Sequence, residues 1–170
     1  GAFFRDISEY SLFGGYYQTD CANDRQGEIA EQFKNSDTAV NAFCWEKENG
    51  TRVYQTGALN SNSIKNHYSL LHKQASPTPE LEFGVIFTQL RNAMLHESTL
   101  AIKDGVQCAF HTTKLGEGVF GNTKNVSLYA LVAAYKSLPP ENQEAILKIS
   151  IGTYGEPDPS TNSVQDFFKK

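Results

Sequence analysis

The sequence predicts an α/β fold in which a mixed sheet is flanked by helices in three layers (α/β/α). From residue 79 onward, helical patterns alternate with short apolar runs, which is typical of βαβ units and a partly parallel sheet. A glycine-rich loop, Gly-x-Gly-x-x-Gly over residues 116–121, separates one of these runs from the next helical pattern. Upstream, two short strand patterns around a polar turn at 46–50 predict a hairpin.

Length and charge narrow the protein classes to consider. The 170 residues predict a single domain over 1–170, with 153–170 as a loop or tail. The net charge of −4 and the lack of a Lys/Arg cluster argue against direct nucleic-acid binding, because phosphate neutralisation needs clustered cations. No apolar run approaches the length of a membrane span, so we expect no membrane association.

The cysteine pattern bears on the compartment and on metal binding. Cys21, Cys44 and Cys108 are odd in number and widely spaced. This spacing argues against a disulfide framework and against a Cys-x-x-Cys metal site. We therefore expect a reducing compartment such as the cytoplasm, with no metal and no cofactor.

In the first half of the chain, the sequence pattern predicts two helices and a hairpin. Residues 1–20 are aromatic and contain glycines without clear periodicity, and 21–35 have a helical pattern. Residues 38–45 and 51–56 form the predicted hairpin, and 63–74 form a short helix.

The second half begins with a helix start that is clear in the sequence. Thr78 is suited to cap a helix, with Pro79 at its first position. A core stripe at helical spacing follows, made of Phe83, Ile86, Phe87, Leu90 and Met94. Next come a strand at 106–110, a largely apolar helix at 123–138 and a strand at 146–151, and residues 152–164 are expected to be loop.

The loop between the strand at 106–110 and the following helix is the first candidate site. A glycine-rich turn before a helix can direct backbone N–H groups and a helix N-terminus at an anion. Gly116, Gly118 and Gly121 remove the Cβ atoms that would keep a diphosphate away from the backbone. No Gly-Lys-Ser/Thr follows, so this is not a Walker motif. The alternative is that these glycines serve only tight packing.

The order helix, strand, Leu115-Gly-Glu-Gly-Val-Phe-Gly121, helix, strand resembles the C-terminal half of the macrodomain superfamily, and is most similar to its poly(ADP-ribose) glycohydrolase branch. Upstream, Gly14-Gly15 and then Gln26-Gly-Glu28 stand in the order of that branch's glycine run and Gln-Glu-Glu segment. The chain departs from the pattern where the third glycine is Tyr16 and the middle Glu is Gly27. The Asn-Ala-Ala-Asn strand that precedes the glycine run in the family is also missing.

The resemblance implies binding of ADP-ribose or ADP-ribosylated protein. It places Glu28 as the carboxyl group for glycosidic hydrolysis, with Asp20 as second choice. Glu117 is expected to point to solvent. The departures from the motif favour the alternative of a reader that binds ADP-ribose without catalysis. The implied ligand-binding residues are Asp6, Gly14, Gly15, Gly116, Glu117, Gly118, Val119, Phe120, Gly121 and Asn122.

A cysteine hydrolase is an alternative from another class. Cys44 beside Trp45, with His111 at the end of an apolar strand, could supply a nucleophile and a base. The competing interpretation is that Cys44 is an ordinary buried thiol in a strand.

Overall fold

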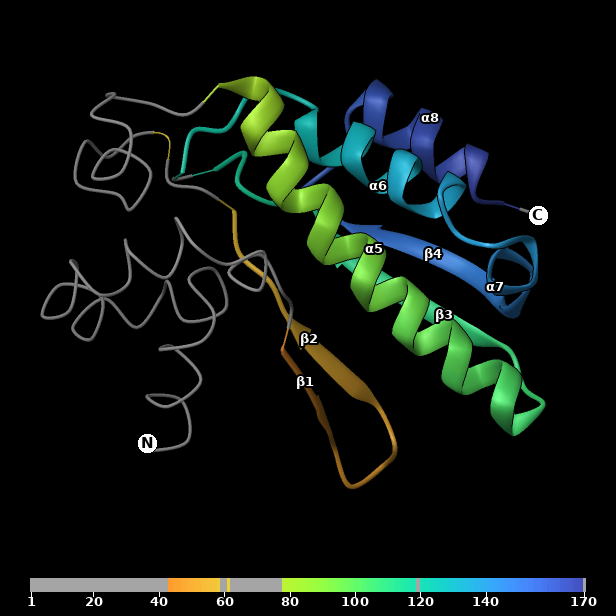
Figure 1. The fold of residues 1–170 in the computed structure, drawn as a ribbon. Helices are drawn as coiled ribbons and strands as arrows, with labels where there is room; N and C mark the ends of the chain where they lie inside the picture. Colours follow the sequence, from red (N-terminus) through yellow and green to blue (C-terminus); the bar gives the residue numbers. More distant parts are fainter. Residues whose placement is uncertain (1–42, 59–60, 62–77, 119, 170) are drawn as a thin grey trace, which may run out of the picture.

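The computed structural model describes residues 43–58, 61, 78–118 and 120–169 (Figure 1). Within them, β1 (Phe43–Glu46) and β2 (Arg52–Gln55) form an antiparallel hairpin, as predicted. A second sheet pairs β3 (Cys108–Thr113) with β4 (Ile146–Gly152) in parallel. The described residues thus mix helices and strands and include a small parallel sheet, which is consistent with the predicted α/β class, whereas the macrodomain arrangement stays a prediction.

Helix α5 (Pro79–Asp104) is the longest element among the described residues and forms one wall of the core. It begins as predicted: Thr78 accepts a hydrogen bond from the backbone N–H of Leu81 at 3.3 Å, and Pro79 occupies the first position. It ends at Gly105, whose φ of 66° closes the last turn in a left-handed conformation. The predicted stripe is confirmed at Ile86, Leu90 and Met94, which are buried, while Phe83 and Phe87 are partly buried and stack on each other.

The chain returns from β3 to β4 through two helices. Helix α6 (Val126–Lys136) packs along α5, and the short α7 (Pro140–Ala145) follows at once. Helix α6 ends at Lys136, and Pro140 starts α7, since proline suits the first helical position. The core lies between these helices and the β3–β4 pair, where Phe110, Leu131 and Ile149 are buried.

The largest differences from the prediction lie in two regions. Strand β3 covers 108–113 rather than 106–110, so His111 to Thr113 belong to the strand and the loop begins at Lys114. The exposed Val106 lies before the strand. The region 153–170, expected to be loop or tail, contains helix α8 (Pro159–Phe167), and Phe168 behind it is buried against Tyr135.

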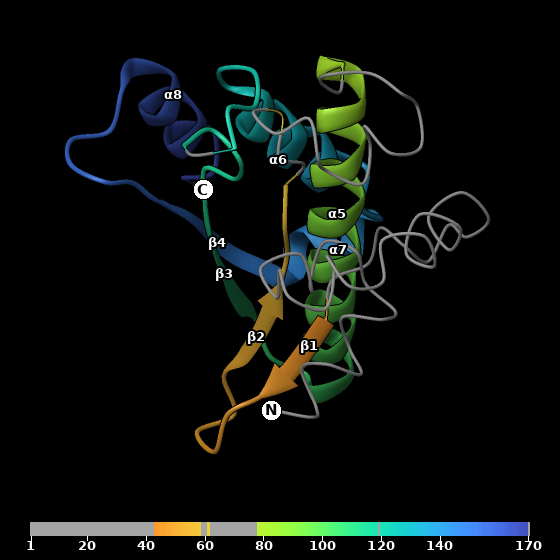
Figure 2. The same ribbon diagram turned by 90° about the vertical axis from the view of Figure 1, so that its left-hand side faces the viewer.

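Helices α5 and α6 lie together on one side of the β3–β4 pair (Figure 2). Along β3 the exposed Ala109 and His111 alternate with the buried Phe110, as expected for a strand packed on one face. The described residues therefore show one helical layer directly against this pair, and they do not test the predicted third layer. No helix in the described ranges combines the length and the apolar character needed to cross a membrane.

Candidate functional site

A cavity of about 560 Å³ lies where β3 and β4 end. Because the two strands are parallel, their carboxyl ends meet at the same edge, which is the usual position of ligands in open α/β sheets. Three segments line the cavity: the end of β3 with the glycine loop, the end of β4 with the turn after it, and the start of α8. The lining residues are Thr113, Lys114, Glu117, Gly118, Gly152, Thr153, Tyr154, Glu156, Asp158 and Thr161.

The three loop glycines have different roles. Gly116 has a φ of 78°, and a Cβ there would lie 2.5 Å from the Cβ of Ala58 and 2.5 Å from Oδ1 of Asn122. Gly121 also has a positive φ, and its N–H donates to the carbonyl of Gly118 at 3.0 Å. Gly118, by contrast, lines the cavity, and a Cβ added to it would meet nothing within 4 Å. Gly116 is therefore required for packing, and Gly121 forms the turn. Of the three glycines, Gly118 lines the cavity.

Glu82 on α5 anchors the second half of the loop. Its side chain is buried and accepts hydrogen bonds from Oγ of Ser61 at 2.6 Å and from the backbone N–H of Thr123 at 2.9 Å. Asn122 is buried beside them and donates from Nδ2 to Ser61 Oγ at 3.2 Å. The phenyl ring of Phe120 packs against the core. The side chains of Asn122 and Phe120, both expected to contact ligand, therefore contact other residues of the protein.

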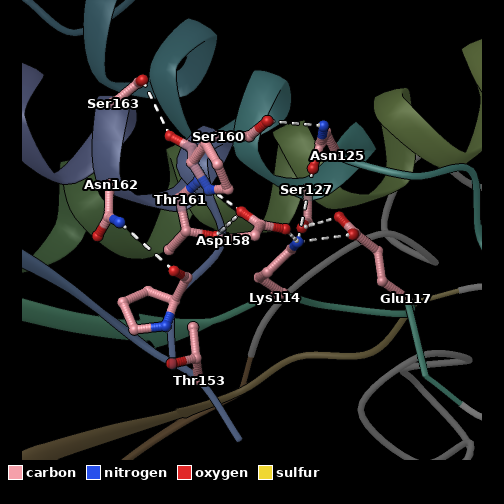
Figure 3. A network of polar contacts seen from close by, with 12 residues as sticks. Lys114, Glu117, Asn125, Ser127, Thr153, Asp158, Ser160, Thr161, Asn162 and Ser163 are labelled. Atoms are coloured by element: carbon pink, nitrogen blue, oxygen red, sulfur yellow. Dashed lines mark hydrogen bonds and ion pairs between the residues drawn. The ribbon is translucent and has the colours of Figure 1, made fainter. Parts of the chain in front are cut away.

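Lys114 is the centre of a polar network beside the cavity (Figure 3). Its Nζ lies 3.1 Å from Oε2 of Glu117 and 3.1 Å from Oδ2 of Asp158. The other oxygen of Glu117 accepts a hydrogen bond from Oγ of Ser127, in the first turn of α6, at 2.7 Å. The expectation that Glu117 points to solvent is wrong: its side chain is only 11% exposed, because Lys114 and Ser127 hold it inward.

The network also sets the charge state of its members. Hydrogen bonds from the backbone N–H and hydroxyl of Thr161, and then from Lys114, hold the pKa of Asp158 well below its usual range. Burial alone would lower the pKa of Lys114, but hydrogen bonds to Asp158 and Glu117 raise it above its ordinary value. Both groups are therefore charged at neutral pH.

The described lining residues make the cavity acidic overall. Glu117, Glu156 and Asp158 contribute three carboxylates, whereas Lys114 is the one cation among them and already contacts two of these carboxylates. With Lys114 paired in this way, backbone N–H groups are the donors left for an anionic ligand. Within the described ranges, no three His, Cys, Asp or Glu side chains gather in a way that could hold a metal ion.

Several predicted site residues lie outside the described residues. They are Asp6, Gly14, Gly15, Asp20, Glu28 and Val119. Conversely, sequence reasoning missed Lys114, Glu82 and Asp158. The sequence did contain a signal for Asp158: like Thr78-Pro79, Asp158-Pro159 is a capping residue followed by a proline. In the structure, the carboxylate of Asp158 caps α8.

Cys44 and His111 line different cavities. Cys44 is exposed on β1, directly opposite Tyr54 on β2, and lines a cavity of about 530 Å³ that also contains His96. His111 lines another cavity, of about 550 Å³, beside β2 and β3. The histidine that shares a cavity with Cys44 is thus His96, and the expectation of a buried Cys44 is wrong.

Tyr54 connects this second cluster to α5. Its hydroxyl lies 2.7 Å from Nδ1 of His96 and donates to Oε2 of Glu97 at 2.9 Å. Burial, and then the hydrogen bond and charge of Glu97, raise the pKa of Tyr54. Tyr54 therefore stays a neutral phenol at physiological pH. Arg52, 3.1 Å from Oε1 of Glu97, also fastens the hairpin to α5.

Comparisons with protein-family models, curated proteins and solved structures give no significant match to this chain. The likeness to macrodomains therefore rests on the loop motif and on the order of elements around it.

Proposed function

We propose that the cavity at the carboxyl ends of β3 and β4 binds ADP-ribose, free or attached to modified protein. One observation carries the proposal: the backbone of Gly118 opens, without a Cβ, on a cavity at the carboxyl edge of two parallel strands, just before α6. This is the arrangement in which glycine loops hold diphosphates in α/β proteins. A volume of about 560 Å³ is also within the usual range of small-molecule sites.

The chemistry of the lining suits the different parts of this ligand. The diphosphate would lie against the loop backbone at Gly118, where glycine allows close approach. Hydroxyl groups of a ribose can donate to carboxylates and to the side chains of Thr113 and Thr153, which line the same cavity. Tyr154, fully exposed beside them, offers an aromatic face for the adenine or the ribose.

Hydrolysis of a glycosidic bond needs a carboxyl group that can give up a proton at neutral pH. Asp158 does not suit this task, since its hydrogen bonds to Thr161 and Lys114 keep its carboxylate ionised. Glu28, with Asp20 as second choice, remains the proposed catalytic residue. A protein that binds ADP-ribose but releases none from a modified substrate would be the non-catalytic reader.

A thiol hydrolase at the second cluster is the other candidate function. It is supported by the exposure of Cys44 in the cavity that His96 also lines. If Nδ1–H of His96 donates to Tyr54, the other ring nitrogen is left to accept a proton from a thiol.

The test of ADP-ribose binding uses two matched glycine variants. Gly118→Val places a branched side chain in the proposed diphosphate position, whereas Gly84→Val places the same group in open space on α5, away from the cavity. Calorimetric titration should show that Gly118→Val loses roughly tenfold or more in affinity, about 1.4 kcal/mol, while Gly84→Val binds like the wild type. Equal affinity in Gly118→Val would mean that the diphosphate lies elsewhere.

A further inference from the structure

We infer that the carboxylate of Glu117, which lines this cavity and contacts Lys114 and Ser127, competes with the phosphate of an anionic ligand, so that the ligand must displace it to bind. The inference rests on the proposed function and concerns how the same site is regulated. It makes Glu117 an intramolecular competitor of the ligand.

The position of the carboxylate is the first support. Helix α6 has no acidic residue in its first turn, and Asn125 makes no side-chain cap. Glu117 reaches this end of the helix from the loop, where its carboxylate accepts from Ser127 at 2.7 Å. A negative group is favoured at a helix N-terminus by the same dipole that favours a phosphate there. The carboxylate thus lies at this helix end while Glu117 also lines the cavity beside Gly118, where the diphosphate is proposed to lie.

The charge balance around Lys114 is the second support. Glu117 and Asp158 both lie 3.1 Å from its Nζ, and the side chain of Lys114 is 19% exposed. A bound phosphate would be a third anion at this ammonium group, and the repulsion between anions would disfavour it. If Glu117 moves away, Lys114 keeps Asp158 as a partner and can also pair with a phosphate.

The loop can release Glu117 without unfolding. The backbone hydrogen bonds that close the loop join Asn122 to Gly116 at 2.9 Å and Gly121 to Gly118 at 3.0 Å, so they do not involve Glu117 itself. On the C-terminal side of Glu117, the Cβ position of Gly118 has open space, so a change of the backbone there meets no neighbouring side chain. The cavity that its side chain lines provides the space into which it can move.

The test compares three variants by titration with ADP-ribose. Glu117→Gln keeps the size of the side chain and removes its charge, and we expect it to bind about tenfold more tightly than the wild type. Ser127→Ala removes one of the two groups that hold Glu117 and should give a smaller gain, about threefold. Glu156→Gln removes an equal charge from the same cavity, away from α6, and should give at most about a twofold gain.

Titration with adenosine, which has no phosphate, shows whether a gain in affinity comes from the loss of competition by Glu117 or from a general change in the cavity. Its affinity should be the same in the wild type and in Glu117→Gln, because a neutral ligand need not displace the carboxylate. An unchanged or weakened ADP-ribose affinity in Glu117→Gln would overturn the inference, and so would an equal gain in Glu156→Gln. If a folded wild type and all variants fail to bind ADP-ribose, the proposed function fails and the inference with it.

Discussion

Replacing Gly116 by alanine should destabilise the fold, whereas the same change at Gly118 should not. Both glycines belong to the loop motif, but their surroundings differ. At Gly116 the backbone is left-handed, with a φ of 78°, and a Cβ would lie 2.5 Å from both Ala58 Cβ and Asn122 Oδ1. These contacts are far shorter than van der Waals distance. At Gly118 the φ is not left-handed and the added methyl group meets nothing within 4 Å.

The magnitude follows from two costs. Holding alanine in the left-handed region costs about 1–2 kcal/mol, and forcing a methyl group into a filled space costs about 1–3 kcal/mol. We therefore expect Gly116→Ala to lower the free energy of unfolding by about 3 kcal/mol, which for a chain of this size lowers the melting temperature by roughly 6–12 °C. Gly118→Ala should change the free energy of unfolding by less than about 1 kcal/mol.

Urea denaturation followed by circular dichroism measures both values under one condition. Equal stability of Gly116→Ala and the wild type would refute the assignment of Gly116 to packing. A large loss in Gly118→Ala would show instead that Gly118 is a structural glycine, and it would remove the main support for a ligand at this position.

Three further outcomes are expected. Glu82→Ala removes the buried carboxylate that accepts from Ser61 and from the backbone N–H of Thr123, and it should cost about 1–3 kcal/mol of unfolding free energy, measured by urea denaturation. The pKa of Asp158 is lowered in the fold, so its contribution to stability is present above the unfolded pKa of about 3.9 and is lost as the pH falls through the acid range. Asp158→Asn should therefore be less stable than the wild type at pH 6, and the difference should shrink in melts at successively lower pH. In thiol labelling at neutral pH, Cys44 should react much faster than Cys108, because Cys44 is exposed while burial raises the pKa of Cys108; equal rates would contradict the placement of Cys44.

The sequence predicted individual helices and strands correctly where their capping or hydrophobic patterns were strong. Thr78-Pro79 marked the start of α5, and the apolar run at 146–151 marked β4. The strand, loop, helix and strand order also predicted a parallel pair, because such connections return the chain in the same direction. Helix α8 was missed because its Ser, Thr and Asn residues resemble loop composition, although Asp158-Pro159 carried the cap signal.

The site was harder to predict because its decisive contacts are long-range. Nothing in the spacing of Glu82 shows that it reaches Thr123, and nothing in Gly116 shows that Ala58 packs against it. Glu117 was misjudged for the same reason. A carboxylate in a loop normally faces solvent, but here Ser127 on the following helix and Lys114 hold it inward. The sequence motif located the loop, while the roles of its residues depended on tertiary partners.

The central claim is that ADP-ribose binds the cavity at the carboxyl ends of β3 and β4, and its most direct test is thermal melting of the wild type with increasing ADP-ribose. A ligand that binds only the folded state stabilises it by about 2.7 kcal/mol at one hundred times its dissociation constant, which corresponds here to a rise in melting temperature of roughly 5–11 °C. We expect such a rise with the wild type and a much smaller one with Gly118→Val. A melting temperature that does not change at millimolar ADP-ribose would contradict the claim.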